Sequence, residues 1–486
     1  MLCVIRVTAV LSLVLTLILP LGILMVLISL TDIPSTGYLN AAFAVTGSIY
    51  SIIGYLTFKR ISSRGVEIGL FESLLAFSLT WFLIPLLFSI PLALDLGIPL
   101  IDAIFESISG FTGTGLTVLV GLDTLKPSIL LWRAFMQWIG ELGIIVFATV
   151  LMPFIWRFSH ILYSLERPVR ILASLRRTAT RIFQLYVVIT IFGIVACLVT
   201  GMSILDAVVH TMTAIATGGM SNYDVNYQRI YEYAPLSIYP IVVLMFLGGV
   251  SFTVLSLIVS REFKRAWLNE EFRAYVYLTL IALITPLILM LPRVNWSLVD
   301  ALTHGSFNVF SGLTTTGFNI GSISSLPVDL KILTIVFMFI GSMSFATVGG
   351  IKIVRLVILI KAVKSYVIGF ISGGAYQPLV KLSGVTLEER EVFNNLLLII
   401  LHFISVFTGA FIIRIVLPSI DLVDALFETT SAASAVGLST GITTPQAPLT
   451  VKLVLIALMY MGRLEYTPLL VLIGVLFYKK YSAIVK

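Results

Sequence analysis

The chain has 486 residues, of which 58% are hydrophobic and only 11% are charged. With a mean hydropathy of +1.07, it lies far outside the range of soluble globular proteins. The net charge of +7 is therefore read as a membrane-topology signal, and we expect no nucleic-acid partner. The composition predicts an all-α polytopic protein in a lipid bilayer.

Hydrophobic stretches of span length recur along the chain. Because roughly 20 apolar residues cross a bilayer core of about 30 Å, the sequence predicts about ten spans. They lie near residues 8–30, 40–58, 70–94, 129–155, 182–201, 237–260, 274–292, 331–362, 393–417 and 452–478. The first span follows Arg6, and its apolar run is longer than the hydrophobic core of a signal peptide. We therefore expect it to be a retained helix.

Basic residues gather in alternate connections between these spans, whereas the other connections carry mainly Asp and Glu. The positive-inside rule places the basic connections, and with them both termini, in the cytoplasm. The basic residues are Lys59, Arg60, Arg64, Arg167, Arg170, Arg176, Arg177, Arg181, Arg261, Lys264, Arg265, Arg273, Lys361, Lys364, Lys381, Arg390, Lys479, Lys480 and Lys486. We expect a multi-pass protein of the cell (plasma) membrane.

Four short polar segments interrupt the apolar sequence in the connections predicted to be external. Each contains a glycine followed by a large apolar residue and a small polar residue. The segments are 112–117 (TGTGLT), 216–221 (ATGGMS), 314–319 (TTTGFN) and 434–439 (SAVGLS). For a single segment, an external turn or a small-residue packing motif is an equally good interpretation, but four in matching context favour a shared function.

Each segment follows a shorter stretch that begins with Asp-Ala, at Asp102, Asp206, Asp300 and Asp424. Asp suits the start of a helix, where it can cap free N–H groups and meets the positive end of the helix dipole. In the third copy the Asp lies further from the glycine, which predicts an extra helical turn. We therefore expect half-membrane helices that point their negative ends at the polar segments.

Aligned by their glycines, the copies also match six residues earlier, at Ser109, Thr213, Ser311 and Ser431, and nine residues earlier, at Glu106, His210, Asn308 and Glu428. The predicted unit is helix, pore helix, filter loop, helix, used four times around one pore. The expected divisions are an N-terminal two-helix extension over 1–66 and repeats over 67–178, 179–268, 269–385 and 386–486.

Four such loops can surround one axis with backbone oxygens, which is how membrane proteins strip water from a cation. Glycine suits this role because it permits positive φ and close backbone approach. An ion pore is therefore the leading interpretation of the residues themselves. The alternative is a secondary transporter that couples another cation or small solute to H⁺ or Na⁺.

Further motifs resemble the Trk/Ktr-type potassium transporters, members of the superfamily of K⁺ transporters. They are 132–140 (WRAFMQWIG), 248–252 (GGVSF), 341–352 (GSMSFATVGGIK) and 462–465 (GRLE). Two extra N-terminal spans make the chain more similar to the Trk branch. The resemblance implies potassium uptake through a channel-like pore and no enzymatic activity.

The same resemblance implies the site residues. The ion-binding selectivity filter would comprise Thr114, Gly115, Gly218, Gly219, Thr316, Gly317, Val436 and Gly437, flanked by Thr112, Gly113, Thr217, Thr315 and Ala435. K⁺ would be the transported ion and the only metal, held at these residues alone. Ala435 and Val436 make the fourth wall less polar than the others.

The glycine-rich stretch 341–350 would interrupt a membrane helix and form an intramembrane gate. Its residues are Gly341, Ser342, Ser344, Thr347, Gly349 and Gly350. Irregular backbone at membrane depth is tolerated where it is buried in protein or lines a cavity. The alternative is an interruption that serves helix packing alone.

Two charged residues fall within predicted spans. Arg463 would add an electrostatic barrier below the filter, and Glu141 stands where family members often carry glycine. Intramembrane charges are functional hypotheses by default. The alternatives are a structural partner for Glu141 and an ion pair of Arg463 with Glu465 or Glu141.

The resemblance also implies partners. We expect a homodimer and a cytosolic nucleotide-binding (NAD/ATP-type) regulatory subunit. The chain carries neither GxGxxG after a strand nor a GK[ST] motif, so a separate subunit would supply the nucleotide site and this chain would hold no cofactor.

Overall fold

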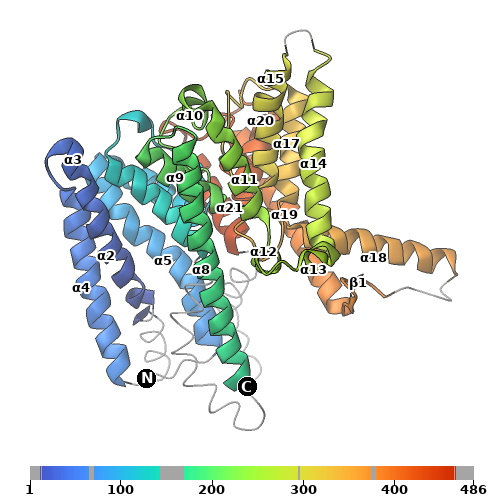
Figure 1. The fold of residues 1–486 in the computed structure, drawn as a ribbon, viewed down its shortest axis with the longest axis horizontal. Helices are drawn as coiled ribbons and strands as arrows, with labels where there is room; N and C mark the ends of the chain where they lie inside the picture. The colour runs from blue at the N-terminus through green and yellow to red at the C-terminus, as the bar shows by residue number, and fades with distance from the viewer. Residues whose placement is uncertain are drawn as a thin grey trace. The chain divides into compact units, whose positions relative to one another are not determined.

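The computed structural model describes residues 11–12, 14–64, 70–142, 169–293, 296–373, 379–464 and 466, and this part of the chain is mostly helical (Figure 1). The chain divides into two compact units. The first comprises Met1–Phe111, Gly121–Ile189 and Leu464–Lys486, and the second comprises Thr112–Val120 and Thr190–Arg463. All four glycine-bearing loops belong to the second unit.

The first unit contains the N-terminal helices and most of the predicted first repeat. Its elements are α2 (Ile18–Ser29), η1 (Leu30–Asp32), α3 (Ile33–Thr36), α4 (Ala41–Arg64), α5 (Leu70–Leu96), α6 (Leu100–Phe111), η2 (Leu122–Thr124), a helix over 127–142 and the first part of α8 (Val169–Val199). Helices α2 and α4 pack closely, because a Cβ placed on Gly54 would lie 2.6 Å from the backbone nitrogen of Leu19. Small residues permit such approach between membrane helices.

Aromatic side chains form the core of the first unit. The rings of Phe88 and Trp132 lie 5.3 Å apart, and Phe43 and Phe111 pack in the same cluster. A buried carboxylate adds a polar connection, since Asp32 accepts hydrogen bonds from the Ser128 N–H at 2.8 Å and the Ser128 hydroxyl at 2.7 Å. The two N-terminal helices are thus joined to the helix over 127–142 within one core.

The second unit contains the rest of the described chain. Its elements are the end of α8, α9 (Ile204–Ile215), α10 (Gln228–Tyr233), η3 (Pro235–Ser237), α11 (Ile238–Gly249), α12 (Phe252–Val259), α13 (Phe263–Leu268), α14 (Glu270–Met290), α15 (Leu298–Asp300), η4 (Ala301–Phe307), α16 (Asn308–Leu313), α17 (Val328–Ile340), α18 (Ile353–Ile371), β1 (Lys381–Leu382), β2 (Val385–Thr386), α19 (Glu389–Val416), α20 (Leu422–Ala433) and α21 (Leu449–Leu464). The strands pair antiparallel, with Lys381 opposite Thr386.

Six helices in the described part of the chain are long and apolar enough to cross a membrane. They are Val14–Thr36, Ala41–Arg60, Leu79–Leu96, Thr180–Val199, Glu270–Met290 and Glu389–Val416. Each coincides with a predicted span. The total of about ten spans stays a prediction, because parts of 129–155 and 452–478 lie outside the described residues.

The predicted span over 237–260 is not straight. Pro235–Gly249 and Phe252–Val259 meet at 115°, and the Ser251 hydroxyl caps the second helix by accepting a hydrogen bond from the Val254 N–H at 3.3 Å. The predicted span is thus formed by two helices joined at a sharp bend. Hydropathy misses the bend because both halves are equally apolar.

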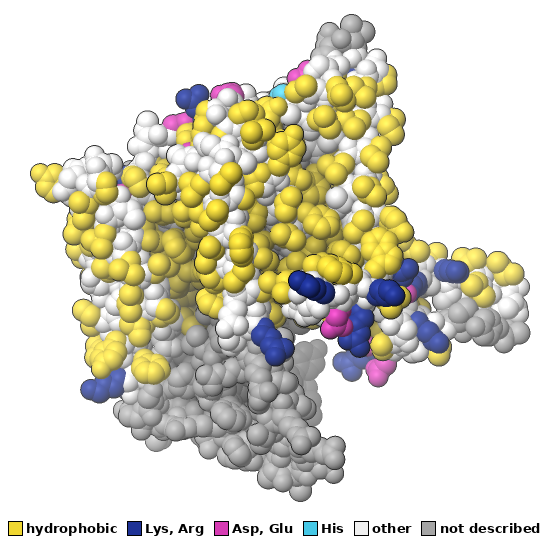
Figure 2. All heavy atoms as spheres, in the orientation of Figure 1, with side chains coloured by type: hydrophobic (Ala, Val, Ile, Leu, Met, Phe, Trp, Pro, Cys, Tyr) yellow, Lys and Arg dark blue, Asp and Glu magenta, His cyan; other side chains and the backbone are white. Residues whose placement is uncertain are grey.

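The predicted span over 331–362 is interrupted where the glycine-rich stretch predicts. Helix α17 ends at Ile340, α18 begins at Ile353, and residues 341–352 are irregular. Helix α18 leaves α14 and α19 at a wide angle (Figure 1). Figure 2 shows Lys and Arg side chains gathered around α13 and α18 and a broad apolar surface over α11 and α14.

Candidate functional site: four converging loops and the segment beside them

Each glycine-bearing loop directly follows the C-terminus of a short helix. Helices α6, α9, α16 and α20 end at Phe111, Ile215, Leu313 and Ala433, four residues before the loop glycine in every case. The C-terminus of a helix carries partial negative charge. The short helices therefore deliver this charge to the start of each loop.

The Asp residues of the Asp-Ala pairs do not cap the second and third short helices. In α9 and α15 the cap is a serine three residues earlier: Ser203 accepts from the Asp206 N–H at 3.2 Å, and Ser297 accepts from the Asp300 N–H at 3.1 Å. The predicted N-cap role of these Asp residues is thus wrong. Asp300 instead completes a capping box by accepting the Ser297 N–H, because its position in the first turn faces back toward the cap.

The third short helix contains the extra residues that the spacing predicts. The helix runs from Leu298 to Leu313, longer than the 12-residue helices α6, α9 and α20, and its part over Ala301–Phe307, between α15 and α16, has π-helical winding. A π-helix uses more residues per turn than an α-helix. The loop that follows Leu313 therefore begins at the same position relative to its glycine as in the other copies.

The four loops share one backbone conformation. The glycines Gly115, Gly219, Gly317 and Gly437 have φ of 83°, 68°, 88° and 96°, and the residues two positions earlier, Gly113, Thr217, Thr315 and Ala435, have φ of 71°, 49°, 51° and 50°. Left-handed residues at alternate positions allow successive carbonyls to face one side, whereas a regular strand alternates them. Ala435 adopts the same φ as the threonines, so the less polar fourth loop keeps the shared backbone.

The loops lie side by side in the order two, three, four, one. A Cβ placed on Gly219 would lie 2.0 Å from the Thr316 carbonyl oxygen, one on Gly317 would lie 2.0 Å from that of Val436, and one on Gly437 would lie 2.5 Å from that of Thr114. Only glycine fits at these contacts. The backbones of all four predicted filter segments therefore converge.

In loops three and four, serines six positions before the glycines anchor the loop backbone. The Ser311 hydroxyl accepts from the Gly317 N–H, and the Ser431 hydroxyl accepts from the Gly437 N–H, both at 3.0 Å. The carbonyls of the same serines accept from the N–H groups of Thr316 and Val436, both at 2.9 Å. These bonds engage the N–H groups of the two loops, and the Gly317 carbonyl accepts a separate hydrogen bond from the Asn226 side chain at 3.4 Å.

Residues nine positions before the glycines hold the chain after loops two, three and four. Glu428 accepts from the Ser439 hydroxyl at 2.7 Å and the Thr440 N–H at 2.9 Å. Asn308 bonds both backbone groups of Ile320, and His210 Nε2 lies 2.9 Å from the Ser221 hydroxyl. In the first unit, the equivalent Glu106 forms a buried ion pair with Arg133 at 2.6 Å.

The second helices approach the ends of the short helices through small residues. A Cβ placed on Gly140 would lie 2.1 Å from the Phe111 carbonyl oxygen, and one on Gly462 would lie 2.0 Å from that of Ala433. At the third copy, the Ser342 hydroxyl donates to the Leu313 carbonyl at 2.8 Å. The family-like motifs 132–140, 341–352 and 462–465 thus contain residues that pack at equivalent places.

The irregular segment 341–352 lies directly against three of the loops. Thr347 donates its hydroxyl to the Ile215 carbonyl at 2.9 Å, and the Gly349 N–H donates to the Thr315 hydroxyl at 3.0 Å. A Cβ placed on Gly349 would lie 1.9 Å from the Ser434 carbonyl oxygen. The predicted gate residues and the predicted filter loops are therefore in contact.

The carboxylate of Glu271 accepts hydrogen bonds from this segment and from the start of α18. Oε1 of Glu271 accepts from the Ser344 N–H at 2.6 Å and from the Val354 N–H at 3.2 Å. Backbone bonds join the segment to the bend between α11 and α12, where Met343 N–H donates to the Gly249 carbonyl at 3.2 Å. These bonds hold the segment against the N-terminus of α14 and against the bend between α11 and α12.

The two predicted pore charges belong to different units. Glu141 is buried in the first unit, with 7% of its surface exposed. Arg463 is half-buried near the end of α21 in the second unit. Glu465, an alternative partner for Arg463, lies outside the described residues, so that alternative stays open.

A family model described as TrkH, cation transport protein, matches residues 40–481. The chain belongs to the TrkH family. Among TrkH-family relatives, a cation transporter of Methanocaldococcus jannaschii is 30% identical over 444 residues, covering 90% of this chain and 89% of the relative. The Trk system potassium uptake protein TrkH of Escherichia coli K12 is 32% identical over 394 residues, covering 78% of this chain and 80% of the relative.

Solved structures agree with this assignment. The crystal structure of the potassium transporter TrkH from Vibrio parahaemolyticus matches with a TM-score of 0.79 and 26% identity, over 94% of this chain and 98% of that one. The predicted resemblance to Trk-type transporters is confirmed. The chain is accordingly a helical, multi-pass membrane transport protein of the TrkH family and not an enzyme.

Several residues at the site were not predicted from the sequence. Glu271 lies at the edge of an apolar run, and its contact with a segment more than 70 residues away is not encoded by its neighbours in the chain. Ser311 and Ser431 were aligned by position, but their hydrogen bonds to the loop N–H groups depend on the loop conformation. A charge within reach of a predicted span was the available clue for Glu271.

Proposed function

We propose that this protein takes up potassium through a pore lined by the carbonyls of its four loops. The observation that carries the proposal is the convergence of the four loops with matching alternate positive φ. Carbonyl oxygens can replace the hydration shell of a cation, and the nearby helix C-termini favour positive charge. The relatives named as Trk system potassium uptake proteins make K⁺ the expected ion.

The proposed ion ligands are the carbonyls of Thr114, Gly218, Thr316 and Val436 and of the glycine after each. They come from the backbone, so the replacement of threonine by valine in the fourth loop preserves them. The hydroxyls of Ser311 and Ser431 support this arrangement because they hold the N–H groups of Gly317 and Gly437 in loops three and four.

The segment 341–350 is the proposed gate. It contacts loops two, three and four, and its order depends on the bonds of Thr347, Gly349 and Glu271. Release of these bonds would move the segment away from the loops and open the path. Arg463 is the proposed electrostatic barrier on that path, and Glu141 is a proposed structural carboxylate.

Potassium entry is proposed to follow the membrane potential, which supplies about 2.3 kcal/mol per charge for each 100 mV. The experiment is flux into liposomes that contain the purified protein, with K⁺ or Na⁺ outside. We expect K⁺ flux that follows the K⁺ electrochemical gradient and is unchanged by an imposed H⁺ or Na⁺ gradient. Accumulation of K⁺ against its own gradient, driven by H⁺ or Na⁺, would instead identify a coupled secondary transporter.

We also propose two protein partners, a second copy of this chain and a cytosolic nucleotide-binding subunit. Helix α18 supports a docking role, since it leaves the neighbouring helices (Figure 1) and exposes Tyr366, Phe370 and Ile371 at 69%, 79% and 78%. Light scattering of the purified protein should give the mass of two chains. A monomer mass that is unchanged across concentrations would contradict the dimer.

A further inference from the structure

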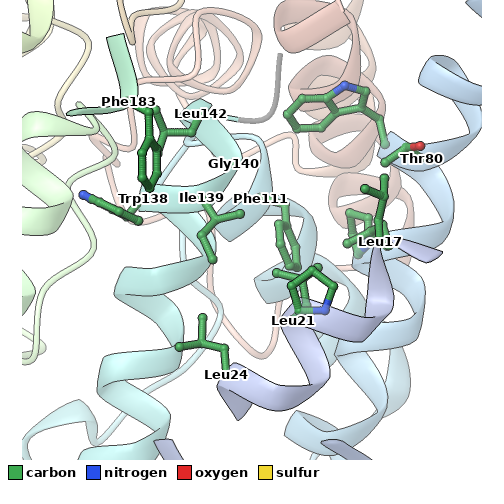
Figure 3. Close-up of a pocket in the computed structure, with 14 residues that line it drawn as sticks. Leu17, Leu21, Leu24, Thr80, Phe111, Trp138, Ile139, Gly140, Leu142 and Phe183 are labelled. Atoms are coloured by element: carbon green, nitrogen blue, oxygen red, sulfur yellow. The ribbon is translucent and has the colours of Figure 1, made fainter. Parts of the chain in front are cut away.

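The first unit contains an apolar cavity whose lining residues all belong to that unit, whereas the four loops belong to the second unit. Its volume is about 370 Å³. Figure 3 shows Leu21 of α2, Phe111 of α6 and Ile139 of the helix over 127–142 pointing toward the same space. The proposed ion path uses none of these side chains.

The cavity lies between helices that have the composition of membrane spans. It is lined by residues of Val14–Thr36, Leu79–Leu96 and Thr180–Val199, three helices with the length and hydropathy of membrane spans. Apart from Thr80, its lining residues are apolar or aromatic. An apolar cavity of this kind does not hold ordered water, which needs several polar partners.

The cavity also reaches the surface of the unit. Phe183 lines it and is 42% exposed, whereas Trp81 lines it and is 7% exposed. A molecule could therefore enter at the exposed Phe183 and extend to the buried Trp81. For a multi-pass membrane protein, the apolar molecules available to such an opening are lipid chains.

We propose that this cavity binds one acyl chain of a membrane phospholipid. A cavity of about 150 Å³ with similar lining binds benzene, so the larger volume suits an extended alkyl segment. Burial of each methylene contributes about 0.8 kcal/mol in transfer from water, but within a bilayer the gain comes from close packing against the rings of Trp81 and Phe111. The proposal concerns binding alone, so its test needs no ion flux.

The test uses tryptophan fluorescence and phospholipids with brominated acyl chains, which quench on close contact. One variant keeps Trp81 alone, and its matched control keeps Trp132 alone, with the other tryptophans changed to Phe. Trp132 is 1% exposed and does not line the cavity. In brominated phosphatidylcholine vesicles we expect Trp81 to be quenched at least twofold more than Trp132.

Filling the cavity supplies the second arm. Leu24→Phe with Ile139→Phe should reduce Trp81 quenching to the level of Trp132, whereas Leu27→Phe, at a position 57% exposed and outside the cavity, should leave it unchanged. Equal quenching of Trp81 and Trp132, or quenching that survives filling, overturns the proposal. If the single-tryptophan chains do not fold, the Trp81→Phe variant of the otherwise unaltered chain is compared with the parent. We expect brominated lipid to quench a smaller fraction of its total tryptophan fluorescence.

Native mass spectrometry of the unaltered protein separates lipid from detergent. We expect one bound phospholipid that the filled variant loses and the Leu27→Phe variant retains. Detergent adducts without phospholipid would overturn the proposal.

Discussion

At the residue scale, the glycines of the four loops are constrained by conformation and by space. Gly317 has φ of 88°, and a Cβ there would lie 2.0 Å from the Val436 carbonyl oxygen. Gly441 has a similar φ of 94°, but a Cβ there would meet nothing within 4 Å. Both positions need a residue that tolerates positive φ, but only Gly317 also lacks space for a side chain.

We therefore expect Gly317→Ser to lower K⁺ affinity and discrimination against Na⁺, because the side chain would displace the neighbouring carbonyl. Gly441→Ser carries the same left-handed strain, about 1–2 kcal/mol, without the contact, and should retain selectivity. Uptake of K⁺ and Na⁺ in transport-deficient cells measures both variants. Unchanged K⁺ affinity and selectivity in Gly317→Ser would count against the filter.

Glu271 offers a second test at this scale. Its carboxylate accepts two backbone N–H groups of the gate region, and hydrogen bonds to charged groups contribute roughly 1.5–3 kcal/mol each. Glu271→Gln keeps the shape but weakens these bonds, so we expect about tenfold or greater K⁺ flux in liposomes from a loss of about 1.4 kcal/mol in the closed state.

The control for this variant is the adjacent residue. Within the described part of the chain, Glu270 pairs with Lys361 and interacts with Ser383 and Arg273, all of which lie outside the segment 341–350. Glu270→Gln should leave flux near that of the unaltered protein. Equal flux in both variants and the parent would show that the carboxylate of Glu271 does not hold the gate closed.

At the element scale, the second helix of each copy reaches the end of a short helix through a small residue. At the fourth copy this residue is Gly462, where a Cβ would lie 2.0 Å from the Ala433 backbone oxygen. The contact involves backbone on one side, so it cannot be relieved by a change of rotamer. Overpacking of this kind costs about 1–3 kcal/mol.

Gly462→Ala should consequently lower the thermal unfolding midpoint and reduce K⁺ flux, because α21 would shift away from α20. Ala457→Ser lies on an exposed part of the same helix and should change neither property. Differential scanning fluorimetry and liposome flux measure both variants. A midpoint for Gly462→Ala that matches the parent would contradict the close packing.

Some elements could be predicted from local sequence, and others could not. The short helices before the loops were predictable because Asp-Ala, the apolar run and the glycine recur together. The bend at Gly249–Ser251 was not predictable from hydropathy, because its cause is the pairing of that backbone with the segment 341–352. The interruption at 341–352 was predictable because several glycines fall within one apolar run.

At the scale of the whole molecule, charge placement predicts orientation. Basic connections should face the cytoplasm, which puts the connection containing Tyr38 outside and the hairpin containing Val385 inside. These side chains are 81% and 68% exposed. Both positions are therefore open to chemical labelling.

In a Cys3→Ser background, Tyr38→Cys should react with an impermeant maleimide in intact cells, and Val385→Cys should react only after permeabilisation. The remaining Cys197 is buried and serves as the unlabelled reference. Labelling of Val385→Cys in intact cells, with protection of Tyr38→Cys, would reverse the predicted orientation.

By itself, the sequence determined the class of protein, the six spans that recur in the described helices, the four glycine loops and the break after Ile340. These features depend on composition, periodicity and local repetition, which neighbouring residues express. Only the tertiary structure decided that the loops converge in the order two, three, four, one, that Ser311 and Ser431 anchor them, and that Glu271 holds the segment beside them. Such contacts join residues far apart in the chain, and no local pattern encodes the close backbone approach that makes each loop glycine necessary.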